Sequence, residues 1–224
     1  MMRLKPRSNV GLYDSRFERE SCGIGFVAHI NKEPSHQNIK DALTILCKMD
    51  HRGARGAEPN SGDGAGILTG MPHAFFAKIS KELYATDLLP GSYSVGNIFL
   101  PNDEDERETC KTYFEETCRE NELKIVGWRI LPTDTKKADI GPTALDAMPQ
   151  IEQVLIVDNL KNCDQEDFEK RLYLTRKKVS NHLRTHSNLN ESELFYVCSL
   201  SSKTIVYLSL IHISEPTRLR RISY

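Results

Sequence analysis

The stretch that decides the fold of this chain reads Cys22-Gly23-Ile24-Gly25-Phe26-Val27-Ala28-His29-Ile30. It opens with small residues and becomes rich in β-formers, so we predict a strand that begins at or just after Cys22. Downstream, Ser35 is suited to cap a helix, and apolar side chains recur at helical spacing from Ile39 to about Met49. This helix is expected to bury one face against a sheet.

A glycine-rich segment, residues 50–66, follows this helix. Glycines permit positive φ angles and close backbone approach, so we interpret the segment as a loop that shapes a pocket rather than as a linker. A short strand is predicted at 67–69 and a helix at 72–84. The predicted buried side of that helix consists of Phe75, Phe76, Ile79 and Leu83.

From residue 93 the pattern is strand, helix, strand, and then again strand, helix, strand. The predicted elements span 93–100, 103–121, 123–131, 153–157, 164–186 and 194–200. The two helices carry apolar stripes at Cys110, Phe114 and Cys118, and at Phe168, Leu172, Val179 and Leu183. This βαβ-βαβ order is typical of a ferredoxin-like unit and predicts an α+β fold class. The cysteines in the first stripe are interpreted as core residues.

Composition narrows the class of function. The 224 residues include 30 Lys and Arg against 31 Asp and Glu, a net charge of -1, which favours neither nucleic acid nor an anionic membrane as a partner. No apolar run is long enough to span a bilayer, and residues 1–21 lack the apolar block of a signal peptide. The six cysteines have no zinc or disulfide spacing, so we expect a cytoplasmic protein that acts on a small molecule. His182 and His186 have the i, i+4 spacing of a metal pair, but the lysines and arginine around them favour a solvated basic face.

Cys22 is the candidate nucleophile. A lone cysteine beside a glycine is more often a small buried hydrophobic residue. Judged from the residues alone, a packing role for Cys22 therefore remains an alternative. A thiol becomes a useful nucleophile when a base lies nearby, and the α-amino group of an N-terminal cysteine, with a pKa of about 7.7–8.0, supplies one. This solution requires removal of residues 1–21.

Three blocks of the sequence resemble the large subunits of glutamate synthases. The first joins Gly11-Leu12-Tyr13-Asp14 to the stretch that begins at Cys22. The second is Met49-Asp50-His51-Arg52-Gly53-Ala54, followed by Glu58-Pro59-Asn60-Ser61-Gly62-Asp63-Gly64-Ala65-Gly66-Ile67-Leu68. The third is Phe195-Tyr196-Val197-Cys198-Ser199-Leu200-Ser201-Ser202-Lys203-Thr204-Ile205-Val206-Tyr207.

The resemblance implies a class II glutamine amidotransferase domain with the N-terminal nucleophile hydrolase fold, an αββα sandwich. Residues 1–21 would be a propeptide, and Cys22 would attack the side-chain amide of glutamine. Arg52 would be a substrate-binding residue, although an arginine that only braces the loop fits equally well. In the full enzyme the resemblance implies FMN, an iron-sulfur cluster, 2-oxoglutarate, and either a small subunit or ferredoxin as electron donor. No residue of this segment is assigned to those cofactors.

The C-terminal residues bear on how much of the domain is present. Residues 208–224 resemble a translated sequencing adaptor, so the native part of the amidotransferase domain is expected to span 22–207 and to be incomplete. The chain alone is then expected to be nearly inactive. Two alternatives remain: another N-terminal nucleophile amidohydrolase, which would not need the 58–68 block, and a non-catalytic α/β module, which would not need a cysteine at a cleavable junction.

Overall fold

A computed structural model describes residues 23–31, 33–49, 60, 64–135, 140–160, 164–185 and 188–208. In chain order, the first helices and strands are α1 (His36–Lys48), β1 (Gly66–Gly70), α2 (His73–Tyr84), β2 (Tyr93–Leu100), α3 (Glu104–Glu120) and β3 (Leu123–Ile130). They continue with α4 (Pro142–Asp146), β4 (Gln150–Asp158), α5 (Gln165–Thr185), a 3-10 helix (Ser192–Leu194), β5 (Tyr196–Ser201) and β6 (Thr204–Leu208). The predicted α+β class is confirmed.

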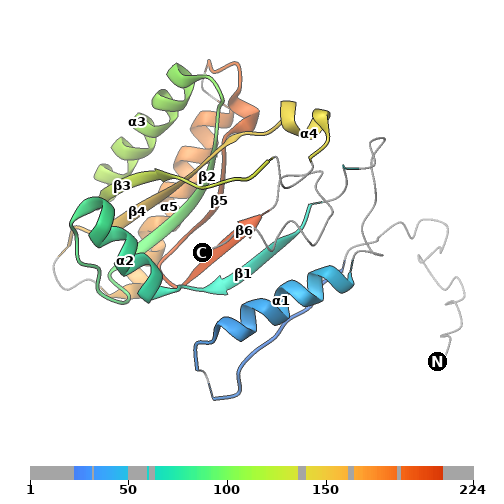
Figure 1. The fold of residues 1–224 in the computed structure, drawn as a ribbon. Helices are drawn as coiled ribbons and strands as arrows, with labels where there is room; N and C mark the ends of the chain where they lie inside the picture. Colours follow the sequence, from blue (N-terminus) through green and yellow to red (C-terminus); the bar gives the residue numbers. More distant parts are fainter. Residues whose placement is uncertain are drawn as a thin grey trace, which may run out of the picture.

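The strands form two antiparallel sheets (Figure 1). The larger has the order β3-β4-β2-β5, and Tyr93 of β2 lies opposite Val157 of β4. The smaller pairs β1 with β6, two strands far apart in the sequence, with Ile67 opposite Tyr207. The chain therefore passes from the larger sheet to the smaller one in the short turn between β5 and β6.

Helices α3 and α5 cover one face of the four-stranded sheet. Their predicted apolar stripes are buried together with strand residues such as Ile98, Val154 and Val197. Both stripes are therefore confirmed, and Cys110 and Cys118 lie in this core with no exposed surface. Burial of an apolar stripe on each helix is what holds the pair to the sheet.

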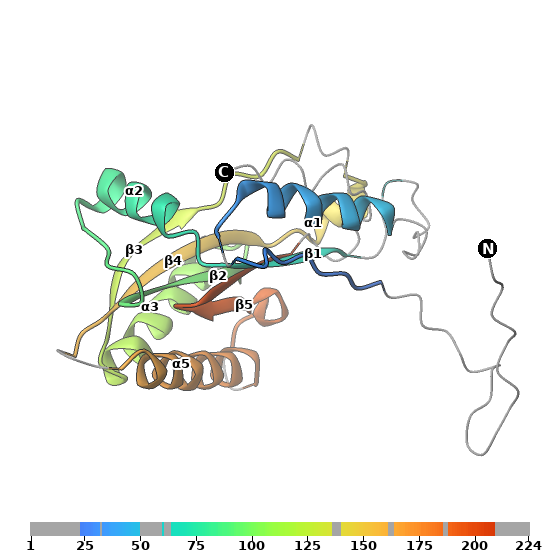
Figure 2. The same cartoon turned by 90° about the horizontal axis from the view of Figure 1, so that it is seen from below.

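The opposite face of the larger sheet is covered by α2 and by the β1–β6 sheet. A second apolar cluster there joins Phe76 of α2, Val95 of β2 and Ile205 of β6. Helix α1 lies on the far side of β1, so that Figure 2 shows helices, the larger sheet, the smaller sheet and a helix stacked in that order. As predicted, Ser35 caps α1 by accepting a hydrogen bond from the N–H of Gln37 at 3.1 Å.

Two local predictions are wrong. Residues 23–29 are not a strand, and Ile24 and Phe26 are 98% and 92% exposed, because the segment packs against α1 and not against a neighbouring strand. Leu83 is also exposed, because its neighbour Tyr84 turns inward instead. The Tyr84 hydroxyl donates to the Trp128 carbonyl at 2.8 Å, and its ring lies against Gly127, which leaves no room for a side chain there.

Candidate active site

The two predicted site residues, Cys22 and Arg52, lie outside the described residues, as do Asp63, Cys163 and His186. The residues next to them in the chain are described. Gly23 follows the predicted nucleophile, and Met49 precedes the loop that contains Arg52. The geometry of the candidate site is therefore built from these flanking residues.

The segment after Cys22 lies against the C-terminal half of α1. A Cβ at Gly23 would be 2.7 Å from the sulfur of Met49, and a Cβ at Gly25 would be 2.5 Å from Cγ2 of Ile45. A side chain at Gly25 would force the stiff, β-branched Ile45 to shift, whereas at Gly23 the flexible end of Met49 could move aside. The small residues that open the deciding stretch are thus explained by packing, and the cysteine block and the loop block meet at Gly23 and Met49.

The other end of the glycine-rich segment joins β1 at Gly66. A Cβ at this position would be 2.6 Å from Cδ2 of Leu208 and 3.3 Å from the Tyr207 carbonyl oxygen. Because β1 pairs with β6, the segment is held at one end by α1 and at the other by β6. The predicted strand at 67–69 is confirmed as the centre of β1.

The buried thiols of the described residues are not activated. Burial raises the pKa of Cys110 and of Cys118 to about 12 and the pKa of Cys198 to about 11. A thiol reacts as its thiolate, so these groups are inert near neutral pH. Their role is packing.

His182 makes a ring contact and belongs to no metal site in the described residues. It stacks on Tyr113 of α3 at 4.1 Å between ring centroids and 16° between planes. No group of three or more His, Cys, Asp or Glu side chains in the described ranges could hold a metal ion. Their four free cysteines, Cys47, Cys110, Cys118 and Cys198, belong to no such group. No helix in the same ranges is long and apolar enough to cross a membrane.

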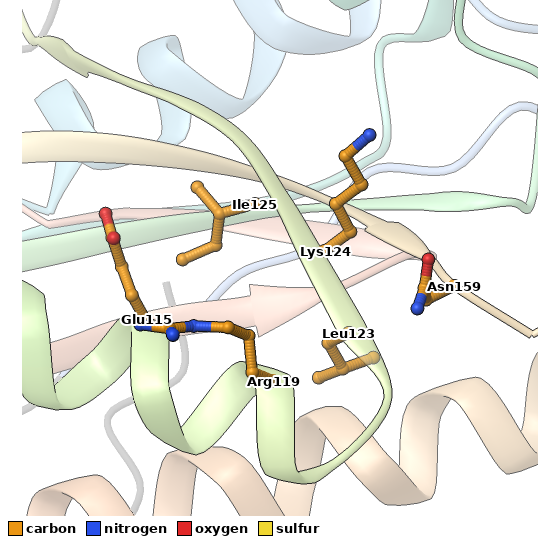
Figure 3. Close-up of a pocket in the computed structure, with 6 residues that line it drawn as sticks. All are labelled: Glu115, Arg119, Leu123, Lys124, Ile125 and Asn159. Carbon is orange, nitrogen blue, oxygen red and sulfur yellow. The ribbon is translucent and has the colours of Figure 1, made fainter.

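A cavity of about 300 Å³ lies between α3 and β3 (Figure 3). Its lining consists of Glu115, Arg119, Leu123, Lys124, Ile125 and Asn159. An oxygen of Glu115 is already occupied, since it accepts a hydrogen bond from Nε1 of Trp128 at 2.9 Å. None of the lining residues was predicted to act in catalysis, and the cavity lies on the helical side of the larger sheet, away from β1 and α1.

The family model for class II glutamine amidotransferases matches residues 22–218 of this chain. The chain belongs to this family. Among curated proteins, the chain is 39% identical over 201 residues to the NADH-type glutamate synthase of Schizosaccharomyces pombe, a match that covers 88% of the chain and 9% of that relative. It is 37% identical to the NADPH-type large chain of Bacillus subtilis and 35% identical to the ferredoxin-dependent chloroplastic enzyme of Spinacia oleracea, with 90% of the chain and 13% and 12% of those relatives covered.

The chain thus spans about a tenth of the length of the curated relatives it matches. The family match begins at Cys22, the residue predicted from the sequence as the nucleophile. One feature of the chain was not predicted from its sequence. It is a hydrogen-bonded row of polar side chains, the half-buried Arg129 and the buried Gln153 and Asn97, and polar residues within otherwise apolar strands are the signal that could have revealed it.

Proposed function

We propose that this chain is the glutamine-hydrolysing domain of a glutamate synthase, with Cys22 as its nucleophile. The observation that carries the proposal is the class II amidotransferase match that begins at Cys22. The packing of Gly23 against Met49 supports it, since the cysteine block and the Arg52 block adjoin there.

In the proposed reaction the Cys22 sulfur attacks the side-chain carbonyl carbon of glutamine. The α-amino group of Cys22, freed by removal of residues 1–21, takes the thiol proton and passes it to the departing nitrogen. The C–N bond breaks, ammonia leaves, and a γ-glutamyl thioester remains. Water then cleaves the C–S bond, which gives glutamate and restores the thiol. Arg52 is proposed to hold the substrate through its planar fork of donors.

The finer description of the fold is part of the proposal. An αββα sandwich is supported by the layer order of helices, larger sheet, smaller sheet and α1. A ferredoxin-like unit is supported by the strand order β3-β4-β2-β5 and by the packing of α3 and α5 on one face. The family match and the antiparallel sheets are consistent with both descriptions.

In the whole protein the ammonia is proposed to aminate 2-oxoglutarate, with reduction through FMN and an iron-sulfur cluster. These cofactors are assigned to the large part of the relatives that this chain does not cover. The relatives' names include NADH, NADPH and ferredoxin forms, which supports a redox partner of one of these kinds. A cytoplasmic location is proposed, and the free cysteines of the described residues support a reducing compartment.

The test uses the full-length protein and two variants, Cys22→Ala and Cys47→Ala. Glutamate formation from glutamine should fall by about three orders of magnitude or more in Cys22→Ala, because the nucleophile is gone. Free ammonium should restore 2-oxoglutarate-dependent glutamate formation in that variant. Cys47→Ala, which removes a half-buried thiol on α1, is the matched control and should keep both activities. Full glutamine-dependent activity in Cys22→Ala would refute the proposal.

A further inference from the structure

The cavity between α3 and β3 has an apolar floor. Leu123 is only 2% exposed and Ile125 is partly buried, and both side chains pack on the face of the larger sheet that α3 and α5 cover. The cavity volume of about 300 Å³ is at the lower end of the range for pockets that hold small molecules. An occupant of this cavity is therefore a small molecule with a short apolar portion.

Polar side chains line the cavity on two sides. Figure 3 shows Glu115 and Arg119, both from α3, on one side and Lys124 and Asn159 on the other, with the apolar pair between them. The i, i+4 spacing of Glu115 and Arg119 permits an ion pair, but none forms. Neither Arg119 nor Lys124 makes a side-chain hydrogen bond or ion pair with any residue that the structure describes. Two cationic side chains therefore line the cavity without a protein partner.

The walls of the cavity are held by hydrogen bonds that do not involve these cations. Nε1 of Trp128 donates to Oε1 of Glu115 at 2.9 Å. Arg171 of α5 holds the turn between α3 and β3, because its Nη1 donates to the Glu122 carbonyl at 3.0 Å. The same carbonyl accepts the backbone N–H of Asn159 at 3.2 Å. A site whose walls are already fixed binds a ligand at a lower entropic cost.

The charges around the cavity indicate the class of ligand. The guanidinium of Arg119 offers a planar fork of donors that suits a carboxylate. Oε2 of Glu115 accepts no hydrogen bond from the described residues, so it can accept one from an ammonium group. A carboxylate and an ammonium held side by side are the α-groups of an amino acid. Across the cavity, the Lys124 ammonium and the Asn159 amide can both donate to a second carboxylate.

We propose that the α3–β3 cavity binds a free acidic amino acid, with its α-groups held by Glu115 and Arg119 and its side-chain carboxylate held by Lys124 and Asn159. The proposal goes beyond the proposed glutaminase function and does not rest on it. Glutamate, the product of the proposed reaction, is a ligand of this class. Because the ends of Arg119 and Lys124 are exposed and salt screens their charges, we expect a Kd of about 1 mM for glutamate.

Lysine labelling of the full-length protein measures occupancy of this cavity directly. Acetic anhydride acetylates Nζ of Lys124, and mass spectrometry of the peptides gives the rate. Glutamate at about 10 mM should slow this acetylation about tenfold, because only about a tenth of the sites would be empty. Lys78 of α2, whose side chain is 72% exposed, is the internal reference and should react at an unchanged rate. Glutamate bound at the proposed catalytic site would not protect Lys124.

Glu115→Gln and Glu116→Gln form a matched pair, because neighbouring residues of α3 lose the same charge. Glu115→Gln keeps an oxygen for Trp128 but loses the charge that holds the ammonium group. It should weaken protection by glutamate about tenfold. Protection by glutarate, which has both carboxylates but no amine, should not weaken in this variant. Glu116 is exposed and does not line the cavity, so Glu116→Gln should leave protection by both ligands unchanged.

Arg119→Gln tests the carboxylate contact, and it should weaken protection by glutamate and by glutarate about tenfold. Unchanged Lys124 acetylation in the presence of glutamate would overturn the proposal. Equal effects of Glu115→Gln and Glu116→Gln, or equal protection of the parent protein by glutarate and glutamate, would overturn the assignment to an amino acid. Lys124 protection in a parent protein without glutaminase activity would refute the proposed function and leave this site in place.

Discussion

Glu169 of α5 holds the turn in which the chain passes from one sheet to the other. Its Oε1 accepts the backbone N–H of Ser202 at 2.5 Å and the Ser202 hydroxyl at 2.6 Å, and the Ser201 hydroxyl donates to both oxygens at 3.0 and 3.1 Å. In Glu169→Gln the shape is kept and the charge is lost. A hydrogen bond to a charged group contributes about 1 kcal/mol more than a neutral one. With three donors and a partly exposed carboxylate, we expect the turn to lose about 2 kcal/mol of local stability.

Hydrogen exchange of the full-length protein measures this loss locally. Two kcal/mol corresponds to roughly a 30-fold faster exchange of the backbone amides of the turn and of β6, if local opening governs exchange. The matched control is Lys170→Gln, which removes a neighbouring charge whose partner, Asp167, lies on the solvent-facing side of α5. The control should leave these amides unchanged. Equal exchange in Glu169→Gln and Lys170→Gln would refute the assignment of the turn's stability to the carboxylate.

Three further predictions follow from the packing. Burial raises the pKa of Cys110 and Cys118 to about 12, so the folded protein keeps both thiols protonated while the unfolded chain ionises them near about 8.5. The free energy of unfolding measured in urea should therefore keep the contribution of these thiols below that pH and lose it as the pH rises toward 12. Cys110→Ala removes one of the two groups and should show a smaller fall, so a fall equal to that of the parent protein would contradict this prediction. Gly25→Ala would place its methyl group 2.5 Å from Ile45, so glutaminase activity should drop and be recovered by adding Ile45→Ala; no recovery would count against this contact. Phe114→Ala should lower the free energy of unfolding, measured by denaturant titration, by about 3–5 kcal/mol, because the Phe114 ring is fully buried. A loss below about 1 kcal/mol would contradict the packing of Phe114 in the core.

Much of the α3–β3 and α5–β5 region could be predicted from the sequence. The predicted strand 93–100 is observed as Tyr93–Leu100, and the predicted helix 103–121 as Glu104–Glu120. Such elements carry their own signal, because apolar periodicity reports which face of a helix or strand is buried. The stripe at Cys110, Phe114 and Cys118 is an example, since all three are fully buried.

Contacts between residues far apart in the sequence could not be predicted. The pairing of β1 with β6 joins residues nearly 140 positions apart, such as Leu68 and Val206, and nothing local in either strand specifies its partner. The strand expected after Cys22 failed for a related reason: β-propensity describes a residue's preference, but a strand forms only where another strand offers its backbone groups. Of the candidate site, the role predicted for Cys22 rests on the sequence alone, while the close packing of Gly23 on Met49 needed the structure.

The N-terminal residue of the mature full-length protein tests the central claim most directly. Digestion of the native protein followed by mass spectrometry of the N-terminal peptide gives that residue without any assay of activity. We predict a mature chain that begins at Cys22 with a free α-amino group, which is the base that the proposed mechanism requires. A mature chain that still begins at Met1 or Met2 would contradict the account, because Cys22 would then lack its base.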